Sequence, residues 1–503
     1  MSNLHYDLCV IGGGINGAGI ARDAAGRGLS VVLVEADDLA SATSSASSKL
    51  IHGGLRYLEM YEFKMVREAL KERECLYYAA PHLIRPQKLL LPHDPSQRPL
   101  WLIRLGLFFY DYLGGRKSLP SSSSIKFEDK PNILKSEYTD GFSYYDCWGD
   151  DSRLVVLNAV DAAIHGARIL TRTRCEGLKS ENGIWCITLR DMTYDTTQNI
   201  TARMVVNATG PWARKFLDDT GLSSDDPNIP NVRLVKGSHL IFPKLYEGDN
   251  AYILQQPDKR IIFVIPYEGQ YTLIGTTEEA YEGDDPRDCM ISEAESAYLC
   301  EAHNSFFDKQ LKPEDAIFSY SGVRPLFDDG SSDARCVTRG YRIYHHERYD
   351  SLLLSVFGGK LTTYRALSEQ VVNKLMKSTG RHVPAWTAKT PLSGGEFSDK
   401  RLNPENSFNV FRGQQAQKYP FLPEDLLERY IRAYGTRMDC FLKNSQSLDG
   451  LGKHYGDQIY EAEINYLKYY EWAQSVDDAV WRRSKLGVHI SDETCQALQS
   501  CFL

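Results

Sequence analysis

The sequence predicts an α/β protein with a Rossmann-like nucleotide-binding domain, a mixed-sheet domain woven into it and a helical C-terminal domain. Three observations predict this fold class. A strand, a glycine-rich turn and a helix open the chain, apolar strands recur across residues 234–349, and the segment after Gly395 is helix-compatible. Alternating strands and helices are typical of α/β domains, and 503 residues suffice for two or three domains.

The N-terminal segment has the pattern of a dinucleotide-binding turn. A strand, a turn, a helix and a second strand follow one another: Asp7–Ile11, Gly12–Gly17, Ala18–Gly28 and Leu29–Val34. Gly12, Gly14 and Gly17 fit the G-x-G-x-x-G spacing, which lets a pyrophosphate approach the backbone and the helix N-terminus. Glu35, 18 residues beyond Gly17, can accept hydrogen bonds from a ribose diol. An ordinary packing turn is the alternative interpretation.

A Ser/Gly-rich segment, Ala42–Tyr57, follows this turn and favours FAD over NAD. NAD needs one nucleotide unit and a catalytic domain, whereas the longer FAD needs further contacts along its ribityl chain and ring system. Two other segments follow apolar strands in the same way, Asn207–Trp212 and Phe357–Tyr364. Each alone could be a loop of small residues, but together they predict an extended cofactor cradle.

The remaining chain divides into interleaved segments. We expect nucleotide-binding segments at about 1–75, 151–233 and 350–380, and substrate- or membrane-facing segments at about 76–150 and 234–349. Residues 1–388 would form this composite unit, and residues 389–503 the helical domain. A helix is expected from about Tyr61 to Ala80 and another at Asp151–Gly166, and an irregular segment is expected at Pro81–Asp150, with a loop tip at Ser121–Ser124.

Composition excludes several classes of function. The 58 basic and 66 acidic residues give a formal charge of −8, which argues against a nucleic-acid partner. The eleven cysteines show no C-x-x-C or His-paired spacing, so the sequence predicts neither a metal site nor a disulfide framework. This cysteine usage favours a reducing cytoplasm. The first strand begins within about six residues of the N-terminus, so we expect no signal peptide. No apolar run reaches the roughly 18–20 residues of a membrane span.

The segment Ile84–Ser118 nevertheless suits a lipid surface. It contains the apolar and aromatic run Pro99–Leu113. Six cations and two acids accompany that run: Arg85, Lys88, Arg98, Arg104, Arg116 and Lys117, against Asp94 and Asp111. Apolar residues rimmed by cations are typical of peripheral attachment to anionic lipid. A buried core helix is the alternative.

Five segments carry a family resemblance: Ile11–Gly19, Ala42–Glu59, Asn207–Trp212, Tyr320–Pro325 and Phe357–Arg365. They resemble the FAD-dependent glycerol-3-phosphate dehydrogenases, most closely the aerobic, quinone-linked bacterial type, and Asp477–Gly487 extends the likeness to the C-terminus. The resemblance implies oxidation of glycerol 3-phosphate to dihydroxyacetone phosphate, and electron transfer to ubiquinone or menaquinone. It also implies peripheral attachment to the inner face of the bacterial cytoplasmic membrane, and leaves a homodimer open.

Site residues follow from the motifs and the resemblance. The expected FAD contacts are Gly12, Gly14, Asn16, Gly17, Glu35, Thr43, Ser44, Ser45, Lys49, His52, Gly53, Leu55, Thr209, Gly210, Gly358, Gly359, Lys360, Leu361 and Thr362. The expected substrate contacts are Arg56, Tyr57, His239, Arg324, Arg339 and Lys360, because a phosphate dianion calls for several cations.

His239 is the predicted base for the substrate hydroxyl, with Arg324, Lys360 and Arg56 as its electrostatic partners at the catalytic centre. A structural histidine is the alternative. Glu278 stands where similar sequences commonly have Asp, which leaves the role of that carboxylate open. Two other functions also stay open: an oxidase that passes electrons to O2, and a flavin redox sensor without turnover.

Overall fold

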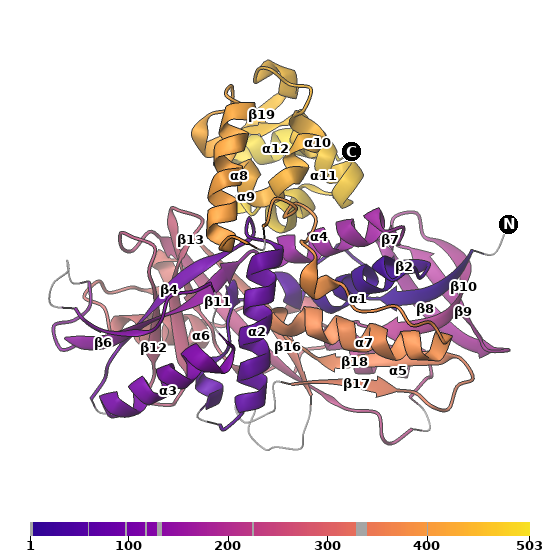
Figure 1. Ribbon diagram of the computed structural model, residues 1–503, viewed down its shortest axis with the longest axis horizontal. Helices are drawn as coiled ribbons and strands as arrows, with labels where there is room; N and C mark the ends of the chain where they lie inside the picture. Colours follow the sequence, from indigo (N-terminus) through magenta and orange to yellow (C-terminus); the bar gives the residue numbers. More distant parts are fainter. Residues whose placement is uncertain are drawn as a thin grey trace.

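Two sheets lie side by side, and a domain of C-terminal helices packs above them in the view of Figure 1. This computed structural model describes residues 4–58, 60–95, 98–115, 118–127, 133–223, 226–327, 340–399 and 401–502. The architecture confirms the predicted α/β fold class, with its Rossmann-like sheet, its mixed sheet and its helical C-terminal domain.

The first sheet is parallel at its centre. Its strands, in spatial order, are β17 (Tyr341–His345), β18 (Leu352–Gly358), β10 (Thr196–Asn207), β1 (His5–Ile11), β2 (Val31–Val34) and β7 (Arg168–Leu170). An antiparallel pair, β8 (Thr173–Glu181) and β9 (Ile184–Asp191), extends it from β10. The strand β2 is buried at all four positions because helices cover one of its faces and β8 and β9 cover the other, which explains its unbroken valine and leucine run.

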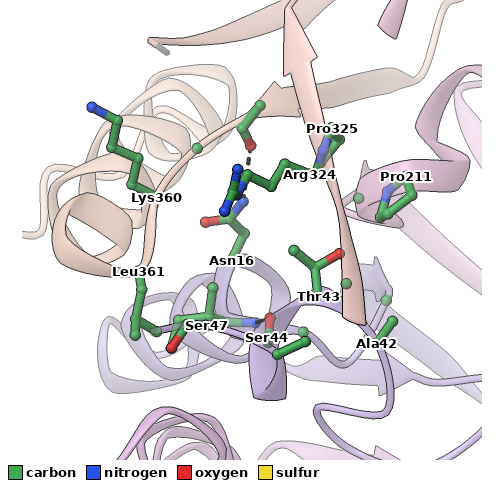
Figure 2. A pocket seen from close by; sticks show the side chains of 18 of the residues that line it. Asn16, Ala42, Thr43, Ser44, Ser47, Pro211, Arg324, Pro325, Lys360 and Leu361 are labelled. Carbon is green, nitrogen blue, oxygen red and sulfur yellow. Dashed lines mark hydrogen bonds between the residues drawn. The ribbon is translucent and has the colours of Figure 1, made fainter. Parts of the chain in front are cut away.

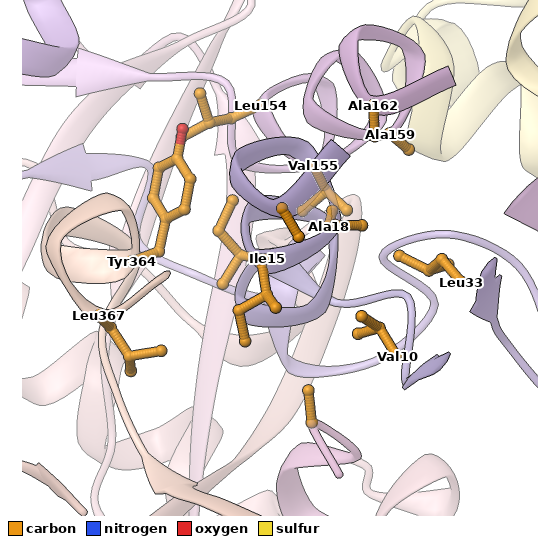
Figure 3. Close-up of a cluster of buried hydrophobic side chains, with 14 of the residues drawn as sticks. Val10, Ile15, Ala18, Leu33, Leu154, Val155, Ala159, Ala162, Tyr364 and Leu367 are labelled. Atoms are coloured by element: carbon orange, nitrogen blue, oxygen red, sulfur yellow. The ribbon is translucent and has the colours of Figure 1, made fainter. Parts of the chain in front are cut away.

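Three helices form the layer that holds the nucleotide-binding turn: α1 (Ile15–Gly26), α4 (Asp151–Ile164) and α7 (Tyr364–Thr379). Figure 3 shows their buried side chains meeting those of β1 and β2. Ala18 of α1 is fully buried against this cluster, and small residues there allow α1 to lie close to both α4 and α7. The helix α4 lies where the sequence predicted it, with its end two residues earlier.

The second sheet is mixed and stands beside the first. Its strands, in spatial order, are β15 (Glu279–Ala280), β11 (Val232–Pro243), β14 (Tyr271–Gly275), β13 (Ile261–Tyr267), β12 (Ala251–Gln255), β4 (Ile84–Pro92), β6 (Asp140–Gly149) and β3 (Leu50–Ile51). Two further strands, β16 (Phe318–Phe327) and β5 (Ser123–Lys126), pair with β11 and β6. The helix α6 (Glu293–Asn304) packs against this sheet.

The segment 81–150 is more regular than the sequence suggested. It contributes β4, α3 (Leu100–Leu113), β5 and β6, and Ser123–Ser124 begin a strand instead of a loop tip. The prediction of an irregular segment is therefore wrong. Prolines at positions 86 and 92 and the charged side chains of β4 hid its apolar pattern, and sheet pairing outweighed those local signals. The preceding helix, α2, spans Phe63–Ala79, close to its predicted bounds.

The helix α3 presents most of its apolar side chains to solvent. Leu107 and Tyr110 are buried, whereas seven others are exposed: Leu100, Trp101, Leu102, Leu105, Phe108, Phe109 and Tyr112. Trp101 keeps 67% of its surface and Tyr112 keeps 61%. The alternative of a buried core helix is therefore wrong. Among the helices that the structure describes, none combines the length and hydropathy that a membrane crossing needs.

The cations predicted around α3 do not all surround it. Arg85 lies on β4 with its guanidinium 4.2 Å from the ring centroid of Trp148, so it belongs to the sheet. Arg104 lies on α3 and donates to the Ser122 hydroxyl at 2.8 Å. Arg116 and Lys117 lie outside the described residues.

The C-terminal segment builds a hydrophobic core of its own. Its helices are α8 (Pro404–Lys418), α9 (Glu424–Tyr434), α10 (Asp439–Leu442), α11 (Glu461–Glu471) and α12 (Asp492–Gln499), with a small hairpin of β19 (His454–Gly456) and β20 (Ile459–Tyr460). Tyr430, Tyr434 and Leu467 are among its buried residues. The boundary between residues 388 and 389 stays a prediction.

Candidate active site

A cavity of about 700 Å³ runs between the two sheets. All three predicted cradle segments line it, together with residues of β6, β12, β13 and β16. Figure 2 shows loop residues such as Thr43, Ser44 and Ser47 on one side and Arg324 and Lys360 on another. Its volume falls within the roughly 300–1,000 Å³ that is usual for small-molecule and cofactor sites.

The glycine turn leaves no room for side chains at the nucleotide end. A Cβ atom on Gly17 would stand 1.8 Å from the Gly12 carbonyl oxygen. Gly12 has a φ of +111°, and a Cβ there would stand 2.5 Å from the Ala208 carbonyl oxygen. The helix α1 starts at Ile15, whose N–H donates to the Ser44 hydroxyl at 3.0 Å. The turn thus brings a helix N-terminus and bare backbone to the cavity wall, as a pyrophosphate requires.

Glu35 closes the same end. Its carboxylate accepts the Gly13 N–H at 2.6 Å and the Asp37 N–H at 2.8 Å. Burial raises the pKa of Glu35 to about 7, although these two N–H groups favour the charged form. Glu35 lines the cavity, so its carboxylate is available to a ribose hydroxyl.

Most of the predicted cofactor contacts meet in this cavity. The lining includes Gly12, Gly14, Asn16, Glu35, Thr43, Ser44, His52, Leu55, Thr209, Gly210, Gly358, Gly359, Lys360, Leu361 and Thr362. Among the described residues, Gly17, Ser45, Lys49 and Gly53 are not in that lining. Gly17 packs beneath the turn, and the buried Lys49 donates to Ser45 O and to Asp151. The structure therefore gives Lys49 a supporting position behind the loop, and its direct contact with FAD stays a prediction.

The other end of the cavity is cationic. Arg56, Arg324 and Lys360 line it together with Tyr57. The Arg324 guanidinium donates to the Thr276 hydroxyl at 2.9 Å, and the Lys360 ammonium lies 4.1 Å from the Tyr57 ring centroid. These cations come from three segments far apart in the sequence. All three line the same cavity, and a small phosphate calls for several cations. Arg339 lies outside the described residues.

One carboxylate stands between the two arginines. Glu278 Oε2 lies 3.6 Å from Arg56 Nη1, and its Oε1 lies 3.8 Å from Arg324 Nη1. Both distances exceed those of direct charge-assisted hydrogen bonds, so neither guanidinium is held tightly by Glu278. The sequence analysis left the role of Glu278 open, and the structure places its carboxylate between Arg56 and Arg324.

His239 lies behind the cavity wall. It is buried on β11, its ring stacks on Tyr320 at 4.7 Å between centroids, and its Nε2 lies 2.8 Å from the Ser48 hydroxyl. Ser48 lines the cavity, whereas His239 is absent from the lining that the described residues form. Burial first, and then Lys49 and Arg324, hold the pKa of His239 well below its usual value. The ring is therefore neutral at pH 7, and its role as base stays a prediction.

The sequence did not single out the apolar wall. Tyr144, Ile253, Ile261 and Phe263 line the cavity from β6, β12 and β13. A broad apolar wall beside a polar cradle suits a flat aromatic ring system. Only the strands' alternating pattern pointed toward these residues, because their common side becomes apparent only when the sheet is assembled.

Comparisons with known proteins agree with this geometry. The profile of the family described as FAD dependent oxidoreductase matches residues 7–365. The profile described as the C-terminal domain of alpha-glycerophosphate oxidase matches residues 385–502.

Similar proteins cover nearly the whole chain. The aerobic glycerol-3-phosphate dehydrogenase of Escherichia coli is 48% identical, over 96% of this chain and 95% of its own length. The D-erythritol 1-phosphate dehydrogenase of Brucella abortus is also 48% identical, over 99% and 97%. A solved structure, the glycerol-3-phosphate dehydrogenase of Bacillus halodurans complexed with FAD, has a TM-score of 0.79 at 28% identity and covers 100% of this chain and 91% of its own. These matches confirm the resemblance inferred from the motifs.

Proposed function

Because the chain belongs to the family of FAD-dependent oxidoreductases, we propose that it is an sn-glycerol-3-phosphate dehydrogenase that yields dihydroxyacetone phosphate. One observation carries this proposal: the cradle for the dinucleotide continues, within the segment 42–57, into Arg56 at the cationic end of the same cavity. An extended cofactor in the cradle therefore ends where a phosphate ester would bind.

Arg56, Arg324 and Lys360 would hold the substrate by its phosphate and keep its secondary alcohol in the cavity. Arginine suits this task because its planar fork binds phosphate oxygens in pairs. The same cations stabilise negative charge that develops on the alcohol oxygen as its proton leaves. When bound, FAD supplies an acceptor for the hydride from C2.

The hydroxyl proton needs a route out of the cavity. Ser48 Oγ faces the cavity and lies 2.8 Å from His239 Nε2, so it can pass a proton to the neutral imidazole. Burial first, and then Lys49 and Arg324, lower the pKa of His239, so the imidazole would hold this proton only as a transient acceptor. His239 is thus the proposed base, with Ser48 between it and the substrate.

Anaerobic titration tests the reaction. Adding glycerol 3-phosphate to the FAD-loaded protein should bleach the visible flavin absorption within the turnover time. An enzyme and a redox sensor without turnover are distinguished by this result, because a sensor would not be reduced by substrate. Unchanged absorption with intact bound FAD would remove glycerol 3-phosphate as the substrate.

A longer polyol phosphate is the second candidate. The observation that favours it is the erythritol-phosphate relative, which is as similar to this chain as the glycerol-phosphate relative. Titrating the same preparation with D-erythritol 1-phosphate and comparing the two second-order rates of flavin reduction decides between them.

A lipid surface is the proposed location of the enzyme. Exposed Met60, Tyr61 and Phe63, just before and at the start of α2, add to the exposed side chains of α3. We call these residues, together with the seven of α3, the apolar patch. The turn Leu55–Leu58, which carries Arg56, packs between them and the cavity. In Figure 1 the helix α3 lies on the side away from the C-terminal domain.

Several features support membrane attachment and quinone reduction at this patch. Clustered exposed aromatic and leucine side chains on one helix suit the boundary between headgroups and acyl chains. A lipid-soluble ubiquinone or menaquinone would reach the patch from the acyl layer, next to the substrate end of the cavity. We therefore propose that the protein attaches to the inner face of a bacterial cytoplasmic membrane.

A double substitution tests the patch. Trp101→Ser with Phe108→Ser should abolish co-sedimentation with anionic phosphatidylglycerol vesicles and lower quinone reduction, while flavin bleaching by substrate is kept. Tyr194→Ser is the matched control, because Tyr194 is 77% exposed in a turn far from α3 in the sequence. Unchanged vesicle binding by the double variant would contradict the proposal.

Two further measurements address the remaining alternatives. Oxygen uptake without quinone would favour an oxidase, and analytical sedimentation would test whether the protein is a homodimer.

A further inference from the structure

A buried charge cluster joins the C-terminal domain to the cofactor loop. Lys485 lies just after a π-helical segment, Asp478–Arg483. Its ammonium donates to Asp150 at 2.7 Å, to Asp151 at 3.1 Å and to the Ser152 hydroxyl at 2.7 Å. These three residues form the N-terminal end of α4, in the nucleotide-binding unit.

Asp151 uses its second oxygen on the cofactor loop. Oδ2 accepts the Lys49 ammonium at 2.7 Å, the Ser47 hydroxyl at 2.7 Å and the Ser47 N–H at 3.2 Å. The Asp151 side chain is fully buried. A single carboxylate therefore connects Lys485 of the C-terminal domain with the loop at residues 45–49.

The loop residues held in this way face the cavity. Ser47 and Ser48 line it, and the Tyr320 hydroxyl donates to the Ser47 carbonyl oxygen at 2.7 Å. The Lys49 ammonium lies 4.7 Å from the Tyr320 ring centroid. A shift of the loop would thus change the cavity wall and the Ser48–His239 contact together.

Charge balance makes Lys485 necessary to this arrangement. Two ammonium groups face the carboxylates of Asp150 and Asp151, and Glu268 contributes to the same field. Both lysines lower the pKa of Asp151, and burial together with Asp150 raises the pKa of Glu268 to about 7. Without Lys485, the remaining acids would share Lys49, and buried carboxylates that lose a cation are strongly disfavoured.

We propose that Lys485 is a positioning residue through which docking of the C-terminal domain holds the loop at residues 45–49 in its FAD-accepting conformation. Because coupling between two binding equilibria is reciprocal, FAD must then also stabilise the docked C-terminal domain. The inference depends on the FAD cradle and is independent of which polyol phosphate is oxidised.

Two variants separate this role from general stability. Lys485→Met should raise the dissociation constant of FAD for the apoprotein by about tenfold, within the usual range of coupling between sites. Glu471→Gln is the matched control, because it disrupts another buried ion pair of the same interface, with Arg153, that does not contact the loop. It should leave the FAD dissociation constant within about twofold. Equal effects of the two variants, or no effect of Lys485→Met, would overturn the proposal.

A measurement on the unaltered protein covers the case in which Lys485→Met does not fold. Adding FAD to the apoprotein should slow backbone hydrogen exchange both at residues 44–49 and at residues 483–488. Protection confined to the cradle, with residues 483–488 unchanged, would show that the two are uncoupled and would reject the proposal. This readout depends on neither substrate nor turnover.

Discussion

The two ends of the cavity are built from different materials. At the nucleotide end, glycine backbone and a helix N-terminus form the wall, and the turn excludes a Cβ at Gly12 and Gly17. At the substrate end, Arg56, Arg324 and Lys360 form the wall with long side chains. The first end is fixed by the chain path, whereas the second is fixed by charge.

This difference predicts different responses to mutation. A backbone wall has no flexible part that can absorb an added atom, so changes there should be all or none. A charged wall can rearrange, because Glu278 lies more than 3.5 Å from both arginines and does not lock them. Substitutions at the substrate end should therefore lower the activity to different degrees while FAD stays bound.

The largest effect is expected at the glycine turn. Gly17→Ala would place Cβ 1.8 Å from the Gly12 carbonyl oxygen, so α1 and the turn must separate. We expect FAD affinity to fall by more than about 10³-fold, measured by flavin fluorescence on titrating the apoprotein. Gly413→Ala is the control, because Gly413 lies in the middle of α8 and a Cβ there would meet no neighbouring atom. This variant should bind FAD normally and gain about 0.5–1 kcal/mol of stability. Normal FAD binding by Gly17→Ala would refute the backbone argument.

Arg324→Ala should have the next largest effect. Loss of one phosphate- or oxyanion-stabilising cation is expected to slow flavin reduction by about 10²–10³-fold, while bound FAD is retained. Stopped-flow bleaching under anaerobic conditions measures this rate. Arg412→Ala is the control, because its guanidinium pairs with Glu424 and Glu428 on the C-terminal helices, and it should leave the rate unchanged. A simultaneous loss of FAD would show that the two ends are not separable.

The sequence was informative where function is local. The strand, the glycine turn and Glu35 are adjacent in the chain, so spacing alone predicted their shared site. It was less informative where long-range packing decides. Lys49 belongs to the cofactor loop, yet its ammonium donates to Asp151, 102 residues later in the chain, behind the cavity wall.

His239 and the segment 81–150 show the same limit. Nothing local to His239 indicates that Tyr320 would cover its ring and Ser48 would separate it from the cavity. Likewise, a strand such as β4, which carries charged residues and prolines, resembles a loop until neighbouring strands pair with it. Both depend on contacts that no window of sequence contains.

A moderate effect is expected at Glu278. Its charge lies near both arginines and opposes a bound phosphate, so Glu278→Gln should strengthen competitive inhibition by inorganic phosphate by about five- to tenfold. Glu279→Gln is the control, because Glu279 pairs with Lys236 instead. Weaker inhibition in Glu278→Gln would mean that the carboxylate orients the arginines, which would make the substrate end more rigid than we infer.

The smallest effect is a dependence of FAD affinity on pH, and it concerns the nucleotide end of the cavity. Among the described residues that line the cavity, Glu35 is the group whose protonation we expect to change FAD affinity. Burial raises the pKa of Glu35 from 4.5 to about 7, so the folded apoprotein binds a proton between these pH values that the unfolded chain releases. This group therefore lowers stability as pH rises through that window, by up to about 3 kcal/mol at about 1.4 kcal/mol per pKa unit.

Ribose hydroxyls donate to the charged carboxylate, so FAD binding favours ionised Glu35 and should tighten as pH rises through about 7. We expect the FAD dissociation constant to fall by about three- to tenfold from pH 6 to pH 8 because of this group. Glu35→Gln should lose that part of the pH dependence, and the difference between the two proteins removes the contribution of Glu268, whose pKa is also raised to about 7. If the FAD dissociation constants of the unaltered protein and of Glu35→Gln change identically with pH, the Glu35 carboxylate does not contribute to FAD affinity. The backbone would then be the main determinant of binding at the nucleotide end.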